Sequence, residues 1–410
     1  MDRVILHSDL NNFYASVECL LHPELKGKCV AVCGSEETRH GIVLAKNEAA
    51  KAMGVKTAET VWQAKRKCPG LVTVKPHFEE YRKYSIMVRE IYKQYTDLIE
   101  PFGMDECWLD VTGSRLLFGD GVTIAERIRA EVKEKTGLTV SVGVSFNKIF
   151  AKLGSDMKKP DAVTEITKEN FRQKVWCLPA GDIIGVGRAT LDKLTTFGIK
   201  TIGDIANTPC EFFEKRFGKM GVYLWQNACG MNDAPVCHQD YRAPAKSIGH
   251  GRTLKEDLVN NEEVWKVIYY LCRELEKSLR QKDVLATACS VSIKDKDLTV
   301  KEYQTTLASS THSAYEIALA LYKLFKEKYP WHKTVRAITV RAVKLAGEDD
   351  EVQLSMFEEE KSDLKRESME KTAFDLENRF GKGAVTFGSL LNNDKMPFDK
   401  EDADEIEVYK

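Results

Sequence analysis

Apolar residues in the first 165 positions form short runs typical of strands, separated by longer stretches with helical periodicity. An apolar run over Val4–Leu6 leads into Ser8 and Asp9, and a helix is expected from Phe13. Further strands are predicted over residues 27–33, 41–45, 107–111 and 138–144, and helices over 47–53, 78–99 and 124–135. This alternation predicts an α/β core with residues 20–75 inserted as a small subdomain.

The pattern changes after residue 165. Residues 165–235 are expected to be helical, and residues 245–345 alternate as strand, long helix, two strands, helix and strand. The latter order is a split βαβ pattern. A polar segment with Pro244 and no periodicity separates the two regions and is predicted to be an interdomain linker.

Length and composition indicate a multidomain globular protein. A chain of 410 residues is too long for one ordinary core. Hydrophobic residues make up 43% and charged residues 30%, and no segment approaches the roughly 20 apolar residues of a membrane span. The N-terminal apolar run is too short for a signal peptide, so a cytoplasmic protein without membrane contact is expected.

The eleven cysteines are scattered, and no CxxC pair occurs. The closest pair, Cys29 and Cys33, lies in an alternating apolar run typical of a buried strand. We therefore expect reduced core thiols rather than a structural zinc site.

The net charge of −1 conceals an uneven distribution. Residues 348–410 contain 19 acidic and 9 basic residues, which leaves 43 acidic and 52 basic residues in positions 1–347. A basic body fits a polyanionic partner, although ordinary solvated lysine faces would produce an excess of the same size.

Three carboxylates are expected near strand ends in the α/β core. Asp9 ends the first strand, and Asp105 and Glu106 precede or begin another. Such a group would suit Mg²⁺, which prefers hard oxygen ligands and substrate phosphates. Adjacent acids on a strand point to opposite faces, however, so their spacing alone does not show that both bind metal.

Three segments carry a resemblance to a known family: DLNNFYASVE, GMDECWLDVTG and SVGVSFNKIFAKLGSDMKKPDAV. In this order they resemble the palm motifs of the Y-family DNA polymerases, and the resemblance extends over about residues 1–345. It implies an α/β and α+β multidomain right-hand polymerase. The implied parts are palm (1–19, 76–164), small fingers (20–75), helical thumb (165–235), linker (236–244), βαββαβ little finger (245–346) and acidic tail (347–410).

The resemblance also implies roles for individual residues. Asp9, Asp105 and Glu106, with the backbone carbonyl of Leu10, would bind two Mg²⁺ ions. Residues implied to contact the incoming deoxynucleotide are Phe13, Tyr14, Ile42, Leu44, Lys51 and Lys159. Tyr14 would exclude ribonucleotides by clashing with the sugar, although an aromatic residue on this helix could equally be core packing.

Three positions, in two segments, depart from the family pattern. Glu48 and Lys51 stand where many relatives have Tyr and Arg on the triphosphate, and Lys51 lacks the bidentate fork of Arg. Glu48 would repel phosphate if it pointed inward, or it would form a solvent-exposed pair with Lys51. Gly103 replaces the usual Ser before the two acids and makes the geometry of that loop uncertain.

Residues outside the palm indicate DNA and a clamp as partners. Gly185 and Gly187 resemble the turn of a helix-hairpin-helix, which binds DNA phosphates without reading sequence. Arg336 and Arg341 resemble residues on a little-finger strand that tracks the template, or are simply solvated. Gln353, Leu354, Met356 and Phe357 resemble the bacterial sliding-clamp binding peptide, and an amphipathic helix of unknown use follows at 361–380.

Together these features predict a monomeric, template-directed DNA polymerase that extends primers with deoxynucleoside triphosphates, without proofreading, opposite damaged DNA. One alternative is a non-catalytic DNA- and clamp-binding adaptor, suggested by Glu48 and Gly103. The other is a nucleotidyl cyclase, whose palm-like core also carries paired acids.

Overall fold

The computed structural model describes residues 3–35, 41–347, 360–381, 384, 385, 388 and 395. These residues form two compact units, one within residues 3–241 and one made mainly of residues 242–347 and 360–381. All eleven cysteines are free thiols. None of the helices in the described part of the chain is long and apolar enough to cross a bilayer.

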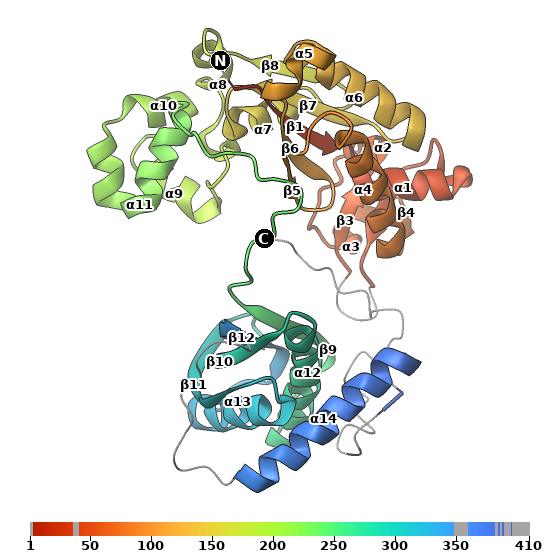
Figure 1. Cartoon of the computed structure of the whole chain (residues 1–410), viewed down its shortest axis with the longest axis vertical. Helices are drawn as coiled ribbons and strands as arrows, with labels where there is room; N and C mark the ends of the chain where they lie inside the picture. Colours follow the sequence, from red (N-terminus) through yellow and green to blue (C-terminus); the bar gives the residue numbers. More distant parts are fainter. Residues whose placement is uncertain are drawn as a thin grey trace. The chain divides into compact units, whose positions relative to one another are not determined.

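The palm of the first unit is built around a five-stranded sheet in the order β5-β6-β1-β7-β8. Its strands are β1 (Ile5–Leu10), β5 (Ile99–Phe102), β6 (Glu106–Asp110), β7 (Val140–Ser145) and β8 (Val163–Ile166). β1 is buried along its whole length because helices cover both faces of the sheet. One face packs against α4 (Phe78–Tyr92) and α6 (Gly121–Thr136), the other against α7 (Lys148–Met157) (Figure 1).

The predicted helix over 78–99 is too long. Helix α4 ends at Tyr92, and residues Ile99–Phe102 form edge strand β5 instead. The C-cap of α4 is Lys93, and three residues later Thr96 ties the chain to β6 by donating from Oγ1 to the Asp110 carbonyl at 2.7 Å. Pro101 is tolerated in β5 because this strand lies at the edge of the sheet. Strands β8 and β4 (Val72–Val74) were not predicted from the sequence.

The fingers consist of a small sheet, β3-β2-β4, with two short helices. Strands β2 (Val30–Cys33) and β3 (Val43–Lys46) match the expected strands with shifted ends, and α2 spans Glu48–Ala52. Helix α3 (Val61–Lys67) begins with a capping box between Thr60 and Gln63. Val43, Val61 and Ala64 belong to the fingers' own core.

The thumb is helical, as expected. It comprises α8 (Phe171–Val175), α9 (Arg188–Thr196), α10 (Ile202–Asn207) and α11 (Cys210–Ala228), with a kink at Gly218 in the last. Gly185, in the turn before α9, has a φ of +96° that an L-residue rarely adopts. This supports the prediction of a glycine-dependent turn at that point.

The second unit has the predicted βαββαβ order. Its elements are β9 (Ile248–Leu258), α12 (Asn261–Gln281), β10 (Val284–Asp295), β11 (Val300–Thr311), α13 (Ala314–Lys328) and β12 (Val335–Gly347). The sheet order is β11-β10-β12-β9, with antiparallel neighbours, and both helices cover one face (Figure 1). Ile338, Val340 and Ala342 of β12 point to the helices and leave Arg341 on the open face.

The predicted C-terminal helix exists as α14 (Glu360–Phe380) and packs within the second unit. Its Glu370 is fully buried and accepts from the Tyr315 backbone N–H at 3.1 Å. Glu377 Oε2 lies 2.7 Å from Lys277 Nζ. Burial and the neighbouring Glu370 charge raise the pKa of Glu276 on α12 to about 7. Helix α14, for which the sequence indicated no use, is therefore part of the little-finger surface.

Candidate active site

Strand pairing brings Asp9 next to Asp105 and Glu106, although Asp9 is far from these two adjacent acids in the sequence. β1 and β6 are antiparallel neighbours, and Asp9 pairs directly with Glu106. The Leu10 backbone N–H donates to the Asp105 carbonyl at 3.0 Å. Asp105 lies before the first residue of β6. The rule that neighbouring side chains on a strand point to opposite faces therefore does not apply to Asp105 and Glu106.

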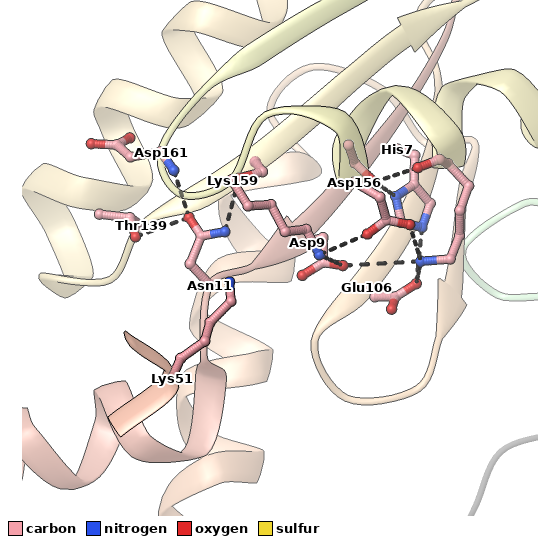
Figure 2. A network of polar contacts seen from close by, with 12 residues as sticks. His7, Asp9, Asn11, Lys51, Glu106, Thr139, Asp156, Lys159 and Asp161 are labelled. Atoms are coloured by element: carbon pink, nitrogen blue, oxygen red, sulfur yellow. Dashed lines mark hydrogen bonds and ion pairs between the residues drawn. The ribbon is translucent and has the colours of Figure 1, made fainter. Parts of the chain in front are cut away.

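Two lysines from the α7 region lie beside two of these acids, Asp9 and Glu106. Lys159 Nζ lies 2.7 Å from Asp9 Oδ2 and 2.8 Å from Asp156 Oδ1. Lys152 Nζ lies 2.6 Å from Glu106 Oε2 and 4.0 Å from Asp9 Oδ2. Figure 2 shows Asp9, Glu106, Asp156 and Lys159 gathered in one polar network. Lys152 was not identified from the sequence.

His7 lies beneath the carboxylates and was also missed. The ring is fully buried, with Nε2 3.1 Å from Glu106 Oε2 and Nδ1 2.8 Å from Ser155 Oγ. The Ser155 hydroxyl donates to the Lys152 carbonyl at 2.7 Å, so its oxygen can accept from Nδ1 of the ring. The available signal was a histidine two positions before Asp9 on the same strand, hence on the same face.

The surroundings shift the pKa values of the three acids in different directions. Burial raises the pKa of Asp9 to about 6, against the opposing charge of Lys159. Burial and the Glu106 charge raise the pKa of Asp105. Burial also raises the pKa of Glu106, but His7 and Lys152 outweigh it and bring the value to about 2. Asp9 and Asp105 are therefore the acids with incomplete charge compensation.

The donor chemistry at this site fits divalent cations. Asp9, Leu10 and Asp105 supply hard oxygen atoms to one pocket, and additional positive charge would stabilise the two carboxylates whose pKa values are raised. Glu106 instead turns toward Lys152 and His7. Consequently, no group of three or more acidic, His or Cys side chains among the described residues converges as a ready-made metal site.

A pocket of ≈ 350 Å³ opens beside the carboxylates, between palm and fingers. The palm side is formed by Asp9, Leu10, Asp105, Glu106 and Lys159, and the entry to α1 (Phe13–Leu21) contributes Asn12, Phe13 and Tyr14. Leu44, Ala45, Lys46 and Thr57 close it from the fingers. The pocket thus unites most of the residues predicted to contact the nucleotide.

Tyr14 is a half-buried residue on the wall of this pocket. Its ring stacks on Tyr81 with centroids 4.3 Å apart, and its hydroxyl lies 3.5 Å from Met104 Sδ. Burial and the Asp105 charge raise the pKa of its hydroxyl. Phe13 is buried in the palm core beside it. Tyr14 therefore combines packing on one side with access to the pocket on the other.

The fingers residues divide according to exposure. Leu44 lines the pocket, whereas Ile42 lies outside its lining and is 39% exposed. Neither belongs to the fingers' core, in which Val43 is the residue of this strand that is buried. Neither side chain therefore fills the fingers' core.

Lys51 and Glu48 form a solvent-exposed ion pair, which is one of the two possibilities given for Glu48 from the sequence. Lys51 Nζ lies 3.5 Å from Glu48 Oε1. Glu48 additionally accepts from Asn12 Nδ2 at 2.8 Å and so joins α2 of the fingers to the palm. Lys51 is not among the residues lining the pocket described above. Figure 2 shows it on the fingers side of the polar network.

Gly103 has a φ of +84°, in the region that favours glycine. Its carbonyl accepts from Arg89 Nη2 at 3.0 Å, and a Cβ at this position would lie 3.6 Å from Asp105 Oδ1. A serine at this position would be strained by the backbone conformation and not by lack of space. The departure from the family pattern thus fits the local loop.

Two of the predicted DNA-binding residues lie in the first unit and two in the second. Gly185 and Gly187 line a second pocket of ≈ 370 Å³, which includes Lys152 and Leu153 of α7. Arg341 Nη1 lies 3.3 Å from Glu302 Oε1 on the open sheet face of the second unit. Arg336 lies where the pairing register of β12 and β9 shifts, next to Val335. Gln353, Leu354, Met356 and Phe357 are outside the described residues.

Comparison with known proteins decides the family. The chain matches the impB/mucB/samB family over residues 8–156 and the C-terminal domain of that family over residues 245–356. The chain belongs to this family, the Y-family DNA polymerases. It is a DNA-directed DNA polymerase of the translesion class, and its right-hand fold with palm, fingers, thumb and little finger confirms the prediction.

Relatives of this Y-family polymerase match almost end to end. It is 50% identical to DNA polymerase IV of Acetivibrio thermocellus over 393 residues, covering 96% of this chain and 98% of the relative. It is 34% identical to DNA polymerase IV 2 of Bacillus subtilis, with 97% of each chain covered. A solved chimera of the Y-family polymerases Dbh and Dpo4 superposes with a TM-score of 0.75 at 25% identity, over 84% of this chain and 99% of the chimera.

Proposed function

We propose that this polymerase adds deoxynucleotides to a primer 3′ end by phosphoryl transfer with two Mg²⁺ ions, without proofreading, opposite damaged templates. The observation that carries the proposal is the single pocket uniting Asp9, Asp105, Tyr14 and Lys159. The substrates would be primer–template DNA and deoxynucleoside triphosphates. The described residues are accounted for by palm, fingers, thumb, little finger and α14, which leaves no exonuclease fold among them.

In this proposal Asp9, Asp105, Glu106 and the Leu10 carbonyl hold the metals. Bound Mg²⁺ would lower the pKa of the primer 3′-hydroxyl and neutralise the charge of the leaving pyrophosphate. Glu106 would exchange its contact with Lys152 for a metal contact. This exchange explains why the acids pair with lysines here and do not form a preassembled three-ligand site.

The remaining pocket residues position the nucleotide. Lys159, 2.7 Å from Asp9, would contact the triphosphate beside the carboxylates. Tyr14 would occupy the space needed by a 2′-hydroxyl. Leu44 and Ile42 on the fingers strand would lie over the nascent base pair. Catalysis would then rest mainly on positioning and charge stabilisation.

Contacts with longer partners are also proposed. Gly185, Gly187, Arg336 and Arg341 would contact the DNA backbone, and Gln353–Phe357 would bind the sliding clamp. Open space at the Cβ positions of Gly185 and Gly187 supports the first part, since a phosphate could approach the backbone closely. Arg341 would have to exchange Glu302 for a phosphate.

A primer-extension assay tests the proposal against its alternatives. A labelled primer on a defined template is incubated with each deoxynucleotide in turn, with Mg²⁺ or with a chelator. A polymerase extends the primer only with the templated nucleotide and only with Mg²⁺. An adaptor extends nothing, and a cyclase forms cyclic nucleotide without template. Removal of a mispaired primer end by hydrolysis would contradict the absence of proofreading.

A further inference from the structure

Helix α3 of the fingers presents an unusually exposed tryptophan. Trp62 is 62% exposed, whereas Val61 and Ala64 are the residues that anchor α3 in the fingers' core. The guanidinium of Arg66, one turn later, lies over the Trp62 ring with Cζ 5.0 Å from its centroid. The ring therefore contributes little to folding and remains open to a ligand. We call Trp62 and Arg66 together the Trp62 platform.

The charge around the Trp62 platform favours an anionic ligand. Residues 55–68 contain four basic side chains and one acidic side chain. The basic residues Lys56, Lys65, Arg66 and Lys67 are all exposed. The acid, Glu59, already forms an ion pair with Lys67. An exposed aromatic ring within positive charge is the combination that binds single-stranded nucleic acid, through base stacking and phosphate attraction.

The Trp62 platform is continuous in the chain with the wall of the active-site pocket. Thr57 lines that pocket, and the segment that follows it runs beside strand β3. The Ala58 N–H donates to the Val43 carbonyl at 2.8 Å, and the Val43 N–H donates to the Glu59 carbonyl at 2.9 Å. A β-bridge then joins Ile42 to Thr60, two residues before Trp62.

This arrangement identifies which nucleic acid would reach the Trp62 platform. Ile42 forms this bridge with Thr60, and Trp62 follows Thr60 by two residues; both side chains are exposed. The bridge lies just beyond the pocket residue Leu44. A template strand leaving the pocket over this edge has not yet been copied, so its bases are unpaired. Bases in the duplex product are stacked in pairs and could not lie on an open ring.

We propose that Trp62 and Arg66 form a stacking platform for the unpaired template strand on the 5′ side of the active-site pocket. Trp62 receives the face of a base, and Arg66 together with neighbouring Lys65 attracts the phosphates. The site is sequence-tolerant, because every base has a face to stack. This inference rests on the proposed primer–template binding.

The test compares DNA affinity with and without a template overhang. Fluorescence anisotropy measures the dissociation constants of one primer–template carrying a 5′ overhang of about ten nucleotides, within the usual site sizes for single strands, and of its blunt counterpart. Trp62→Ala is expected to weaken overhang binding about five- to tenfold and to leave blunt-duplex binding unchanged. Trp62→Phe keeps a ring and should recover most of the loss.

Three controls make the result interpretable. Thermal unfolding of Trp62→Ala should match the parent protein, because the ring is mostly exposed. Binding of the overhang should quench part of the tryptophan emission of the parent protein, and Trp62→Phe should lack that part. This assigns the quenching to Trp62 and not to the other five tryptophans. Arg66→Gln should lower affinity for the overhang and reduce its dependence on salt.

Equal weakening of both DNAs by Trp62→Ala, or no weakening of either, overturns the platform and leaves the tryptophan to another kind of partner. The outcome is independent of catalysis. A parent protein that fails to extend primers, yet shows overhang-dependent binding that Trp62→Ala removes, would refute the proposed function and retain the platform. A parent protein that extends primers normally, with no effect of Trp62→Ala on overhang binding, would retain the proposed function and refute the platform.

Discussion

Asp9 and Glu106 are paired residues on adjacent strands, yet their surroundings move their pKa values in opposite directions. Glu106 has both His7 and Lys152 within ion-pair distance, whereas Asp9 has Lys159 alone at close range. Burial therefore dominates for Asp9 and the contacts dominate for Glu106. These partners hold Glu106 in one orientation.

His7→Leu is expected to raise the Mg²⁺ concentration needed for half-maximal incorporation, because Glu106 loses the ring that orients it. A hydrogen bond to a charged group contributes about 1.5–3 kcal/mol, which corresponds to roughly ten- to hundredfold. His7→Gln retains a donor and should recover most of this. A Mg²⁺ titration of single-nucleotide incorporation measures the effect. A His250→Leu variant, at a buried histidine of β9, is the control. Loss of activity that follows only the melting temperature, equally in both His7 variants and in this control, would show that His7 acts by packing.

Tyr14→Ala is expected to admit ribonucleotides while deoxynucleotide incorporation survives. Relief of a steric clash of about 1–3 kcal/mol should change sugar discrimination about ten- to hundredfold. Incorporation efficiencies of matched ribo- and deoxynucleotides measure the ratio. Tyr14→Phe keeps the ring stacked on Tyr81 and should keep the discrimination. Unchanged discrimination in the alanine variant would reduce Tyr14 to packing.

At the scale of elements, strands and helices with clear periodicity were predictable. β1, β7, α6 and the βαββαβ order of the second unit follow from patterns within each segment. The end of α4, strand β5 and the short strands β4 and β8 were not predictable, because tertiary pairing fixes them. Thr96 bonds to the distant Asp110 carbonyl after the helix, and Pro101 is acceptable because β5 is at a sheet edge.

The candidate site, like the elements, was predictable from the sequence only in part. Asp9, Asp105, Glu106, Tyr14 and Lys159 were found through motifs that specify residue types at fixed spacing, and they meet in one pocket. His7 and Lys152 act through side-chain contacts across three elements, β1, β6 and α7. Such contacts leave only a weak trace in one sequence, such as a histidine two positions before Asp9 on the same strand.

Strand β3 supplies the prediction at this scale. Ile42→Ala combined with Leu44→Ala should improve insertion opposite crosslinked pyrimidines and worsen mispair discrimination, because both side chains lie outside the fingers' core. The parent enzyme should pass abasic sites better than crosslinked pyrimidines. Single-nucleotide insertion efficiency opposite each lesion is the measurement.

Val43→Ala is the matched control, since Val43 is fully buried between the two. It should lower stability by about 1–3 kcal/mol without changing lesion preference. Equal loss by the double variant on all templates would show that Ile42 and Leu44 serve only packing.

At the scale of the whole molecule, a basic body precedes an acidic C-terminal segment. Deletion of residues 353–357 is expected to leave synthesis by the polymerase alone unaltered and to abolish stimulation by a sliding clamp. Leu354 and Phe357 would be the anchors, since a few apolar residues carry most of the binding energy of such a peptide. Primer extension with and without clamp measures this, and Leu354→Ala with Phe357→Ala is the milder companion variant. Undiminished stimulation of the deletion variant would place clamp binding elsewhere.

The central claim is that the carboxylates between β1 and β6 carry out nucleotidyl transfer, whereas thumb and little finger hold the DNA. Asp105→Ala tests it most directly, by single-nucleotide incorporation under single-turnover conditions together with primer–template affinity of the same preparation. The account predicts incorporation below about one per cent of the parent rate, since a lost metal ligand should remove several kcal/mol of transition-state stabilisation, with nearly unchanged DNA affinity. Incorporation well above that level, or a parallel loss of DNA binding, would contradict it.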